Sequence, residues 1–215
     1  MHQLKYSVSW SGGKDAALAL YKAQKSGLQV ASLFTMVSPQ GYTMSHRLPP
    51  ALLERQAQAL GLPVVTGCAD WNGYEAEFKR VLRCLKAEGY HGVVFGDIDI
   101  PEHRQWCRDI CAAEGLTAEH PLWGYKQDDL LAELVALRFT ALIVVVQLDK
   151  LGTEWLGRKL THSTLEELKK AGVSPCGEFG EYHTLVVDGP IFQVPVPINT
   201  DKILTNGGYG FLDLT

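Results

Sequence analysis

The residues best suited to chemistry form a short segment near the start of the chain, Ser11-Gly12-Gly13-Lys14-Asp15. Glycine has no Cβ, so the backbone of Gly12 and Gly13 can approach an anion closely, and free N–H groups at the start of a following helix would point toward it. Lys14 would add a mobile positive charge and Ser11 a hydroxyl donor. Asp15 would repel phosphate unless a magnesium ion lies between them as its ligand. The segment therefore predicts a magnesium–phosphate site, and a bare strand-to-helix turn is the alternative.

Two common phosphate motifs do not describe this segment. A Walker loop requires a glycine where Val8 stands, and a serine or threonine where Asp15 stands. The dinucleotide pattern G-x-G-x-x-G is also absent here. The segment therefore indicates a different class of phosphate loop.

A second polar group lies in a glycine-framed segment, where Glu178 follows Gly177 and Glu181 follows Gly180, with His183 two residues further on. Clustered carboxylates in such a loop can orient an amine, hold a metal or transfer protons. The alternative is a turn whose glutamates accept hydrogen bonds from backbone amides before a strand at residues 184–187. The residue types of this segment, taken alone, favour the turn over a catalytic or metal-binding loop.

Several single residues are further candidates. Asp97 follows Gly96 at the end of a predicted strand, where ligands gather in open α/β sheets, although an aspartate that caps a helix is nearly as good an interpretation. Arg104 and Arg158 could bind phosphate or carboxylate. His46 and Arg47 could contact phosphate or substrate, and a solvated loop is an equally good interpretation of them. His103, Cys107 and Cys111 share a helix face, but a fourth metal ligand of matching spacing is missing and buried small residues explain the cysteines.

Strand-like and helix-like segments alternate along the first 120 residues. The expected strands cover residues 6–10, 30–37, 63–67 and 92–95, and the expected helices cover 15–25, 49–61, 75–88 and 102–114. This alternation predicts an α/β fold with a doubly wound parallel sheet. Helices at 128–137 and 164–170, a strand at 141–148 and a tail of strands and loops follow. We expect a nucleotide-binding domain at residues 1–120 and a smaller α/β substrate-binding lobe at 121–215.

The bulk composition narrows the class of protein. The 215 residues carry 20 basic and 24 acidic side chains, a formal net charge of -4, which makes nucleic acid an unlikely partner. The five cysteines form no CxxC pair and indicate a reducing compartment. The polar N-terminus does not resemble a signal peptide, and the most apolar run, residues 141–146, is too short to cross a membrane. We expect a soluble cytoplasmic protein, with homo-oligomerisation left open.

Taken together, the two polar segments resemble a known family. Ser11-Gly12-Gly13-Lys14-Asp15-Ala16 is similar to the S-G-G-x-D-S signature of PP-loop ATP pyrophosphatases, with Ala16 in place of the final serine. Residues 177–184 resemble the G-E-x-G-E-[YF]-x-T signature of the diphthine–ammonia ligase family, with Phe179 and His183 where glycine and glutamate are usual. Further matching pieces lie in the expected order: Gly96-Asp97-Ile98, the helix with Arg104 and Trp106, Pro121-Leu122-Trp123 and Leu156-Gly157-Arg158.

The resemblance implies an adenine nucleotide alpha hydrolase-like, Rossmann-like domain and an amide-forming reaction. In such enzymes a carboxylate attacks the α-phosphate of ATP, pyrophosphate leaves, and ammonia then displaces AMP from the acyl-adenylate. The acceptor in the family is diphthine, a modified histidine of an elongation factor. The implied roles are charge neutralisation by Lys14 and magnesium on Asp15, a grip on substrate by Arg158, orientation of ammonia by Glu178 and Glu181, and proton transfer by His183.

Two other functions compete with this hypothesis. A PP-loop enzyme that modifies tRNA would use the same loop, but the acidic balance and the missing CxxC pair disfavour it. A sensor that holds ATP or AMP without turnover belongs to a different class, and Ala16 favours it slightly. The charged segment at Glu178, Glu181 and His183 favours an enzyme, because a sensor does not need it.

Overall fold

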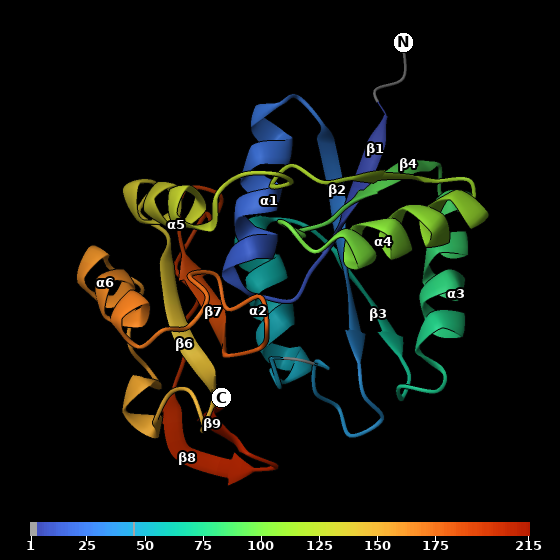
Figure 1. Ribbon diagram of the computed structural model, residues 1–215. Helices are drawn as coiled ribbons and strands as arrows, with labels where there is room; N and C mark the ends of the chain where they lie inside the picture. The colour runs from blue at the N-terminus through green and yellow to red at the C-terminus, as the bar shows by residue number, and fades with distance from the viewer. Residues whose placement is uncertain (1–3, 45) are drawn as a thin grey trace.

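The computed structural model describes residues 4–44 and 46–215 and shows two sheets joined through one helix (Figure 1). The first sheet contains five parallel strands in the order β3-β2-β1-β4-β5. Its strands are β1 (Lys5–Ser9), β2 (Gln29–Val37), β3 (Val64–Cys68), β4 (Tyr90–Val94) and β5 (Thr117–Glu119). Its helices are α1 (Lys14–Lys25), α2 (Pro50–Leu60), α3 (Tyr74–Ala87) and α4 (Pro101–Ala113).

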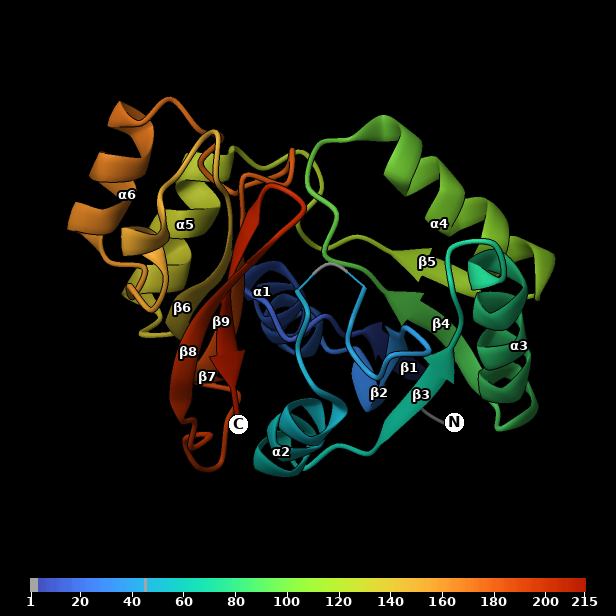
Figure 2. The same ribbon diagram turned by 90° about the horizontal axis from the view of Figure 1, so that it is seen from below.

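The second sheet contains four strands in the order β7-β6-β9-β8, and all of its pairings are antiparallel. Its strands are β6 (Thr140–Gln147), β7 (Tyr182–Asp188), β8 (Thr200–Asn206) and β9 (Tyr209–Leu214). Helices α5 (Gln127–Ala136) and α6 (His162–Lys170) and the 3₁₀ turn η1 (Thr153–Trp155) complete this lobe. In Figure 2, α5 and α6 cover its outer face, and α1 lies between the two sheets.

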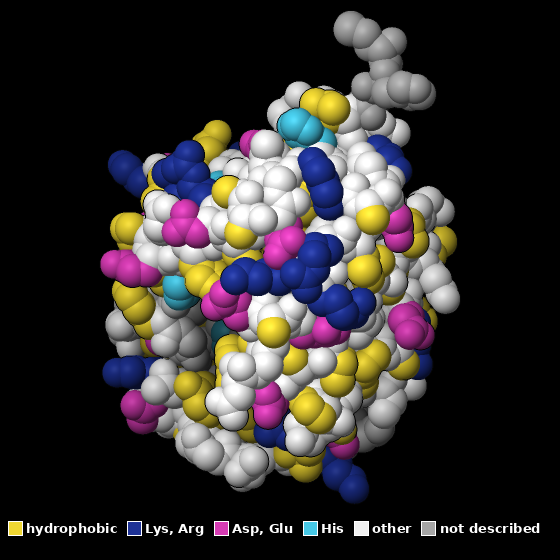
Figure 3. All heavy atoms as spheres, turned by 90° about the vertical axis from the view of Figure 1, so that its right-hand side faces the viewer, with side chains coloured by type: hydrophobic (Ala, Val, Ile, Leu, Met, Phe, Trp, Pro, Cys, Tyr) yellow, Lys and Arg dark blue, Asp and Glu magenta, His cyan; other side chains and the backbone are white. Residues whose placement is uncertain are grey.

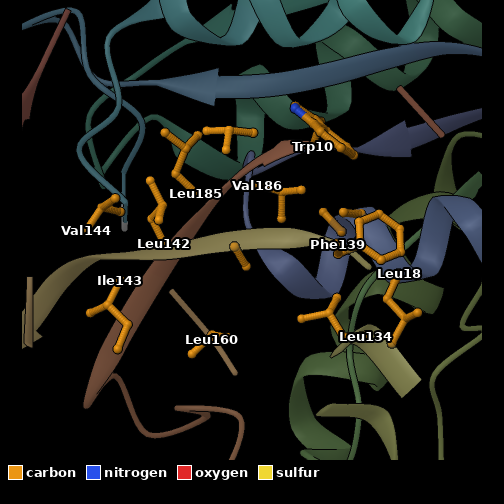
Figure 4. Close-up of a cluster of buried hydrophobic side chains, with 14 of the residues drawn as sticks. Trp10, Leu18, Leu134, Phe139, Leu142, Ile143, Val144, Leu160, Leu185 and Val186 are labelled. Atoms are coloured by element: carbon orange, nitrogen blue, oxygen red, sulfur yellow. The ribbon is translucent and has the colours of Figure 1, made fainter. Parts of the chain in front are cut away.

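Small side chains explain the position of α1. Its alanines at 16, 17, 19 and 23 are buried together with Leu18 and Leu20, so both sheets can approach this helix closely. Leu18 and Trp10 from the first lobe belong to the same core as Leu134, Phe139 and Val186 from the second (Figure 4). A separate core lies on the opposite face of the parallel sheet, under α3 and α4. One continuous core therefore fixes the second lobe against the first.

The predicted doubly wound α/β fold and most of its elements are confirmed. Helix α2 begins at the predicted proline, Pro50, and ends at Gly61, whose φ of 67° is accessible to glycine at little cost. The short strand β5 was not expected, because three residues are too few to show an alternating pattern. The tail expected to hold strands and loops contributes β8 and β9.

The charged side chains on the surface reflect the similar numbers of acidic and basic residues in the sequence. Acidic and basic side chains are mixed on the face formed by α3 and α4 (Figure 3), where Glu75 pairs with Lys79 and Glu77 with Arg80. No helix within the described residues has the length and apolar character needed to span a membrane.

Candidate active site

The phosphate loop connects β1 to α1 and is tightly packed by protein. Gly12 has a φ of +81°, and a Cβ at this position would lie 2.8 Å from Gln56 Oε1 and 2.9 Å from Leu48 Cδ1. A Cβ at Gly13 would lie 2.6 Å from His46 Nε2. The glycine pair therefore allows close approach of neighbouring side chains, and not only of an anion.

Gln56, a buried residue of α2, holds the loop in place. Its Nε2 donates hydrogen bonds to the carbonyls of Gly12 (3.0 Å) and Val186 (2.7 Å), and its Oε1 accepts one from Trp10 Nε1 at 2.9 Å. The Val186 amide also donates to the Gly12 carbonyl at 2.9 Å. One side chain thus links the loop to β7 of the second lobe. The sequence held no signal for this role, because nothing local distinguishes Gln56 from an exposed helix glutamine.

Lys14 is fixed, which corrects the expectation of a mobile charge. Its side chain is only 4% exposed, and its ammonium donates to Asp15 Oδ2 at 2.8 Å and to the Cys176 carbonyl. Burial by itself would lower the pKa of Lys14, but the attraction of Asp15 and other neighbours outweighs it and the pKa is raised. Lys14 is therefore a permanent cation between the two lobes, beside Asp15.

A pocket of about 440 Å³ opens beside this loop. Its polar part contains the predicted residues Ser11, Asp15, Gly96, Asp97 and Glu178. Its other part is aromatic and contains Trp71, Tyr74, Phe78, Phe95 and Trp106. A flat base can stack on aromatic rings while phosphates lie near the loop amides, so the lining suits a nucleotide.

Carboxylates are crowded on the polar wall. The pKa of Glu178 is raised to about 7 by burial first and then by the negative charges of Asp15, Asp99 and Asp97, while Lys14 acts in the opposite direction. A magnesium ion requires oxygen ligands and negative charge. The carboxylates supply both, and Lys14 balances only part of their charge. The residues present therefore fit a magnesium ion held by Asp15 close to the phosphates.

Glu181 has a different role from the one predicted. It is 6% exposed and accepts hydrogen bonds from the Ser174 amide (2.9 Å), the Ser174 hydroxyl (3.2 Å) and the Phe179 amide (3.1 Å). It does not line the pocket. Glu181 therefore organises the loop that carries Glu178, as in the turn interpretation.

His183 lies beside a second histidine, His46. Their ring centroids are 4.6 Å apart, and the place of His46 next to Gly13 puts the pair behind the phosphate loop. Burial and then the positive charge of Lys14 lower the pKa of His183 to about 4, and burial lowers that of His46 well below its ordinary value. Both rings are therefore neutral at neutral pH.

On the far side of His183 lies a smaller pocket of about 290 Å³, lined by Met44, Arg47, Val145, His183, Tyr209 and Phe211. The Arg47 guanidinium lies 4.3 Å from the centroid of the Phe211 ring. Within residues 4–44 and 46–215 no acidic side chain pairs with it, so Arg47 is available to an anion. Its φ of 51°, rare for a residue with a side chain, shows that the surrounding structure constrains it.

Arg158 is not brought to either pocket. Its guanidinium pairs with Glu167 of α6 at 2.7 Å and lies 4.3 Å from the centroid of the Trp155 ring. In place of the expected contact with substrate, Arg158 makes contacts within the second lobe. The sequence carries no signal for this position of Arg158, because its partners come from segments that only the folded lobe brings together. Arg104 likewise packs on Trp123, at 4.4 Å from the ring centroid.

A parallel sheet whose first strand delivers a Ser-Gly-Gly-Lys-Asp loop to an aromatic and acidic pocket defines a PP-loop type of ATP-using enzyme. The diphthamide synthase N-terminal domain model matches residues 4–118, and the diphthamide synthase C-terminal domain model matches residues 126–215. The chain belongs to the diphthamide synthase family. It is accordingly an ATP-dependent ligase that forms a carbon–nitrogen bond, as predicted.

Relatives from vertebrates and yeast agree with this assignment. The diphthine–ammonia ligase of Bos taurus is 26% identical over an alignment of 230 positions, which covers 94% of this chain and 85% of that protein. The enzyme of the same name from Rattus norvegicus is 27% identical over the same shares of the two chains. That of Schizosaccharomyces pombe is 35% identical over an alignment of 217 positions, which covers 89% of this chain but 35% of the longer yeast protein.

Proposed function

We propose that this enzyme adenylates the carboxylate of a diphthine-like acceptor with magnesium-bound ATP and then transfers ammonia to it. The relatives named diphthine–ammonia ligase support the acceptor and the nitrogen source. One observation carries the proposal: Asp15 of the first lobe and Glu178 of the second lobe line the same pocket. An enzyme that joins nucleotide and acceptor needs such a shared wall.

The nucleotide occupies the larger pocket. Its base lies on the aromatic part, and its phosphates lie along Ser11 and the amides at the start of α1. Asp15 would hold a magnesium ion, which would supply positive charge to the leaving pyrophosphate. Lys14 keeps Asp15 in position and adds a fixed positive charge next to it. Asp97, at the end of β4, borders the pocket where the ribose would lie.

The acceptor enters from the smaller pocket. Arg47 attracts the acceptor carboxylate toward this entrance, and the neutral imidazoles of His183 and His46 lie between this pocket and the phosphate loop. The acceptor carboxylate attacks the α-phosphate, and the bond from the α-phosphate to pyrophosphate breaks. Both lobes are needed for this step, because the pocket wall that acceptor and nucleotide share takes Asp15 from the first lobe and Glu178 from the second.

Glu178 serves the second step. Ammonia attacks the acyl carbon, the bond from that carbon to the AMP oxygen breaks, and the attacking nitrogen must lose a proton. A carboxylate whose pKa is raised to about 7 can accept a proton at neutral pH. We therefore expect the rate of amide formation to increase as the pH rises through about 7, where Glu178 loses its own proton.

The test is product analysis with ATP, magnesium, ammonium and an elongation factor that carries diphthine. AMP, pyrophosphate and an amidated acceptor in equal amounts are expected from the unaltered protein, and Asp15→Ala should lose all three. Glu54→Gln, an exposed change on α2, is the matched control and should keep them. ADP and phosphate as products would overturn adenylation, whereas AMP without an amidated acceptor would overturn the choice of diphthine.

A further inference from the structure

A second group of metal-ligating side chains lies on the outer wall of the nucleotide pocket. Asp97 follows β4, Cys107 is on α4, and His120 follows β5. One ligand atom of each lies within 4.8 Å of the other two. Asp97 Oδ2 lies 3.6 Å from Cys107 Sγ and 3.8 Å from His120 Nε2. The proposed reaction uses neither Cys107 nor His120.

His120 is oriented toward this group without a protein partner. Its side chain is 3% exposed, and among the described residues its Nε2 has no hydrogen-bond partner. Burial lowers the pKa of His120, while Asp97 and a hydrogen-bond contribution from the Ala118 backbone act in the opposite direction, and because Nε2 has no partner the Ala118 contribution falls on Nδ1. The ring stacks on Phe95 with centroids 5.5 Å apart. A proton on Nδ1 leaves a lone pair on Nε2, and a bond at the far nitrogen is how metal-binding histidines are normally oriented. A buried, fixed and unused lone pair is the feature of this group that points to a ligand.

The spacing agrees with a tetrahedral metal ion. Zinc bound at about 2.0 Å to oxygen and nitrogen and about 2.3 Å to sulfur separates its ligand atoms by roughly 3.3–3.5 Å. The observed separations from Asp97 Oδ2, 3.6 Å to Cys107 Sγ and 3.8 Å to His120 Nε2, exceed these values by only a few tenths of an ångström. The third pair, Cys107 and His120, has its ligand atoms within 4.8 Å of each other, so binding would draw these two side chains together.

We propose that Asp97, Cys107 and His120 form a binding site for a divalent transition metal of the zinc class. One nitrogen, one sulfur and one oxygen suit zinc, whereas magnesium and calcium prefer oxygen alone. Binding displaces the thiol proton of Cys107 to water, so the thiolate and Asp97 together balance the charge of the ion. That balance is needed because Arg104 and Arg108 also lie close enough to influence His120.

The fourth position of the ion faces the pocket. Asp97 and Cys107 both line it, together with His103. The His103 side chain is 63% exposed at the rim, with Nδ1 4.0 Å from Asp97 Oδ1. Water or His103 therefore completes the coordination. A metal here would tie α4 to the segments after β4 and β5 and form part of the pocket wall.

The experiment uses the full chain freed of metal by a chelator and titrated with Co²⁺ as an optical probe. We expect one Co²⁺ per chain and a thiolate-to-cobalt absorption band, which Zn²⁺ removes by displacement. Cys107→Ser should abolish the band, and His120→Gln should weaken Co²⁺ affinity at least about tenfold. Cys111→Ala removes the other buried cysteine of α4 and should leave the band intact. Circular dichroism of each variant establishes that it is folded.

Three outcomes would overturn the site. One is binding of both Co²⁺ and Zn²⁺ weaker than about 100 μM to the unaltered chain, since specific sites of this ligand set are far tighter. Another is a band that survives Cys107→Ser in a folded protein. The third is an unchanged affinity in folded His120→Gln. None of these depends on ATP or on an acceptor, so failure of the metal site and failure of the proposed reaction are distinguishable.

Discussion

The backbone amide of Lys14 donates a hydrogen bond of 3.1 Å to the hydroxyl of Thr184, a residue 170 positions later in the chain. Lys14 opens α1 and carries the phosphate loop, while Thr184 lies in β7 of the second lobe. The same lysine donates from its side chain to Cys176, just before the Glu178 loop. The nucleotide loop and the acidic loop are therefore parts of one rigid unit.

Replacing Gln56 by alanine should strongly destabilise the protein. The change leaves the Trp10 indole N–H without its partner in the core and removes both bonds donated to the Gly12 and Val186 carbonyls. We expect the free energy of unfolding to fall by about 2–4 kcal/mol, measured by urea denaturation. Gln58→Ala, an exposed change two residues away, should cost less than about 0.5 kcal/mol. Equal effects of the two changes would contradict the role of Gln56.

Glu178→Gln should stabilise the metal-free protein, and more so at high pH. The pKa of Glu178 in the folded state, about 7, lies above that of an unfolded glutamate, so the folded state binds the proton more tightly. The native state therefore loses stability as the pH rises from about 4.5 to about 7. Glutamine removes this cost, and we expect a gain of about 2 kcal/mol at pH 8 and a smaller one at pH 5.

The measurement is urea denaturation at both pH values in the presence of a chelator. Glu54→Gln, on the exposed side of α2, serves as the control and should show no such pH dependence. A gain that is the same at pH 5 and pH 8 would contradict the raised pKa of Glu178.

Glu181→Ala should loosen the acidic loop. The Ser174 and Phe179 amides lose their acceptor, so the segment from Ser174 to Tyr182 should exchange its amide hydrogens faster. Hydrogen exchange followed by mass spectrometry measures this, and amide formation should fall because Glu178 loses its position. Unchanged exchange in this segment would show that Glu181 does not organise the loop.

Arg158→Gln should leave catalysis nearly intact. Its guanidinium pairs with Glu167 and packs on Trp155 away from both pockets, so kcat/KM for ATP should stay within about threefold of the unaltered enzyme. The exposed ion pair should contribute less than about 1 kcal/mol to stability. A loss of kcat/KM by a factor of a hundred in a folded variant would restore the catalytic role that the sequence indicated.

Arg47→Ala should weaken binding of the acceptor without affecting binding of the nucleotide. Arg47 lines the smaller pocket and is absent from the wall of the larger one, so the KM for the acceptor should rise about tenfold or more while ATP binding stays constant. Steady-state kinetics with each substrate varied separately measures both. Arg55→Ala, an exposed change on α2, is the control. Weaker ATP binding in Arg47→Ala would contradict the assignment of the two pockets.

Local patterns account for what could be predicted from the sequence. The alternation of strands and helices depends on short-range periodicity and on stops such as Gly61, and the phosphate loop depends on a contiguous run of five residues. The aromatic wall was not foreseen, because Trp71, Phe78 and Trp106 come from separate segments and each alone resembles an ordinary surface or core residue.

The sequence by itself determined the parallel sheet, the loop from Ser11 to Asp15 and the resemblance to one enzyme family, because each depends on neighbours in the chain. The tertiary structure decided which candidates meet. It brought Glu178 to Asp15, turned Glu181 inward to its own loop and placed Arg158 against Glu167. The reason is physical: the partners of a side chain are set by packing between elements far apart in sequence, and spacing along the chain carries no record of them.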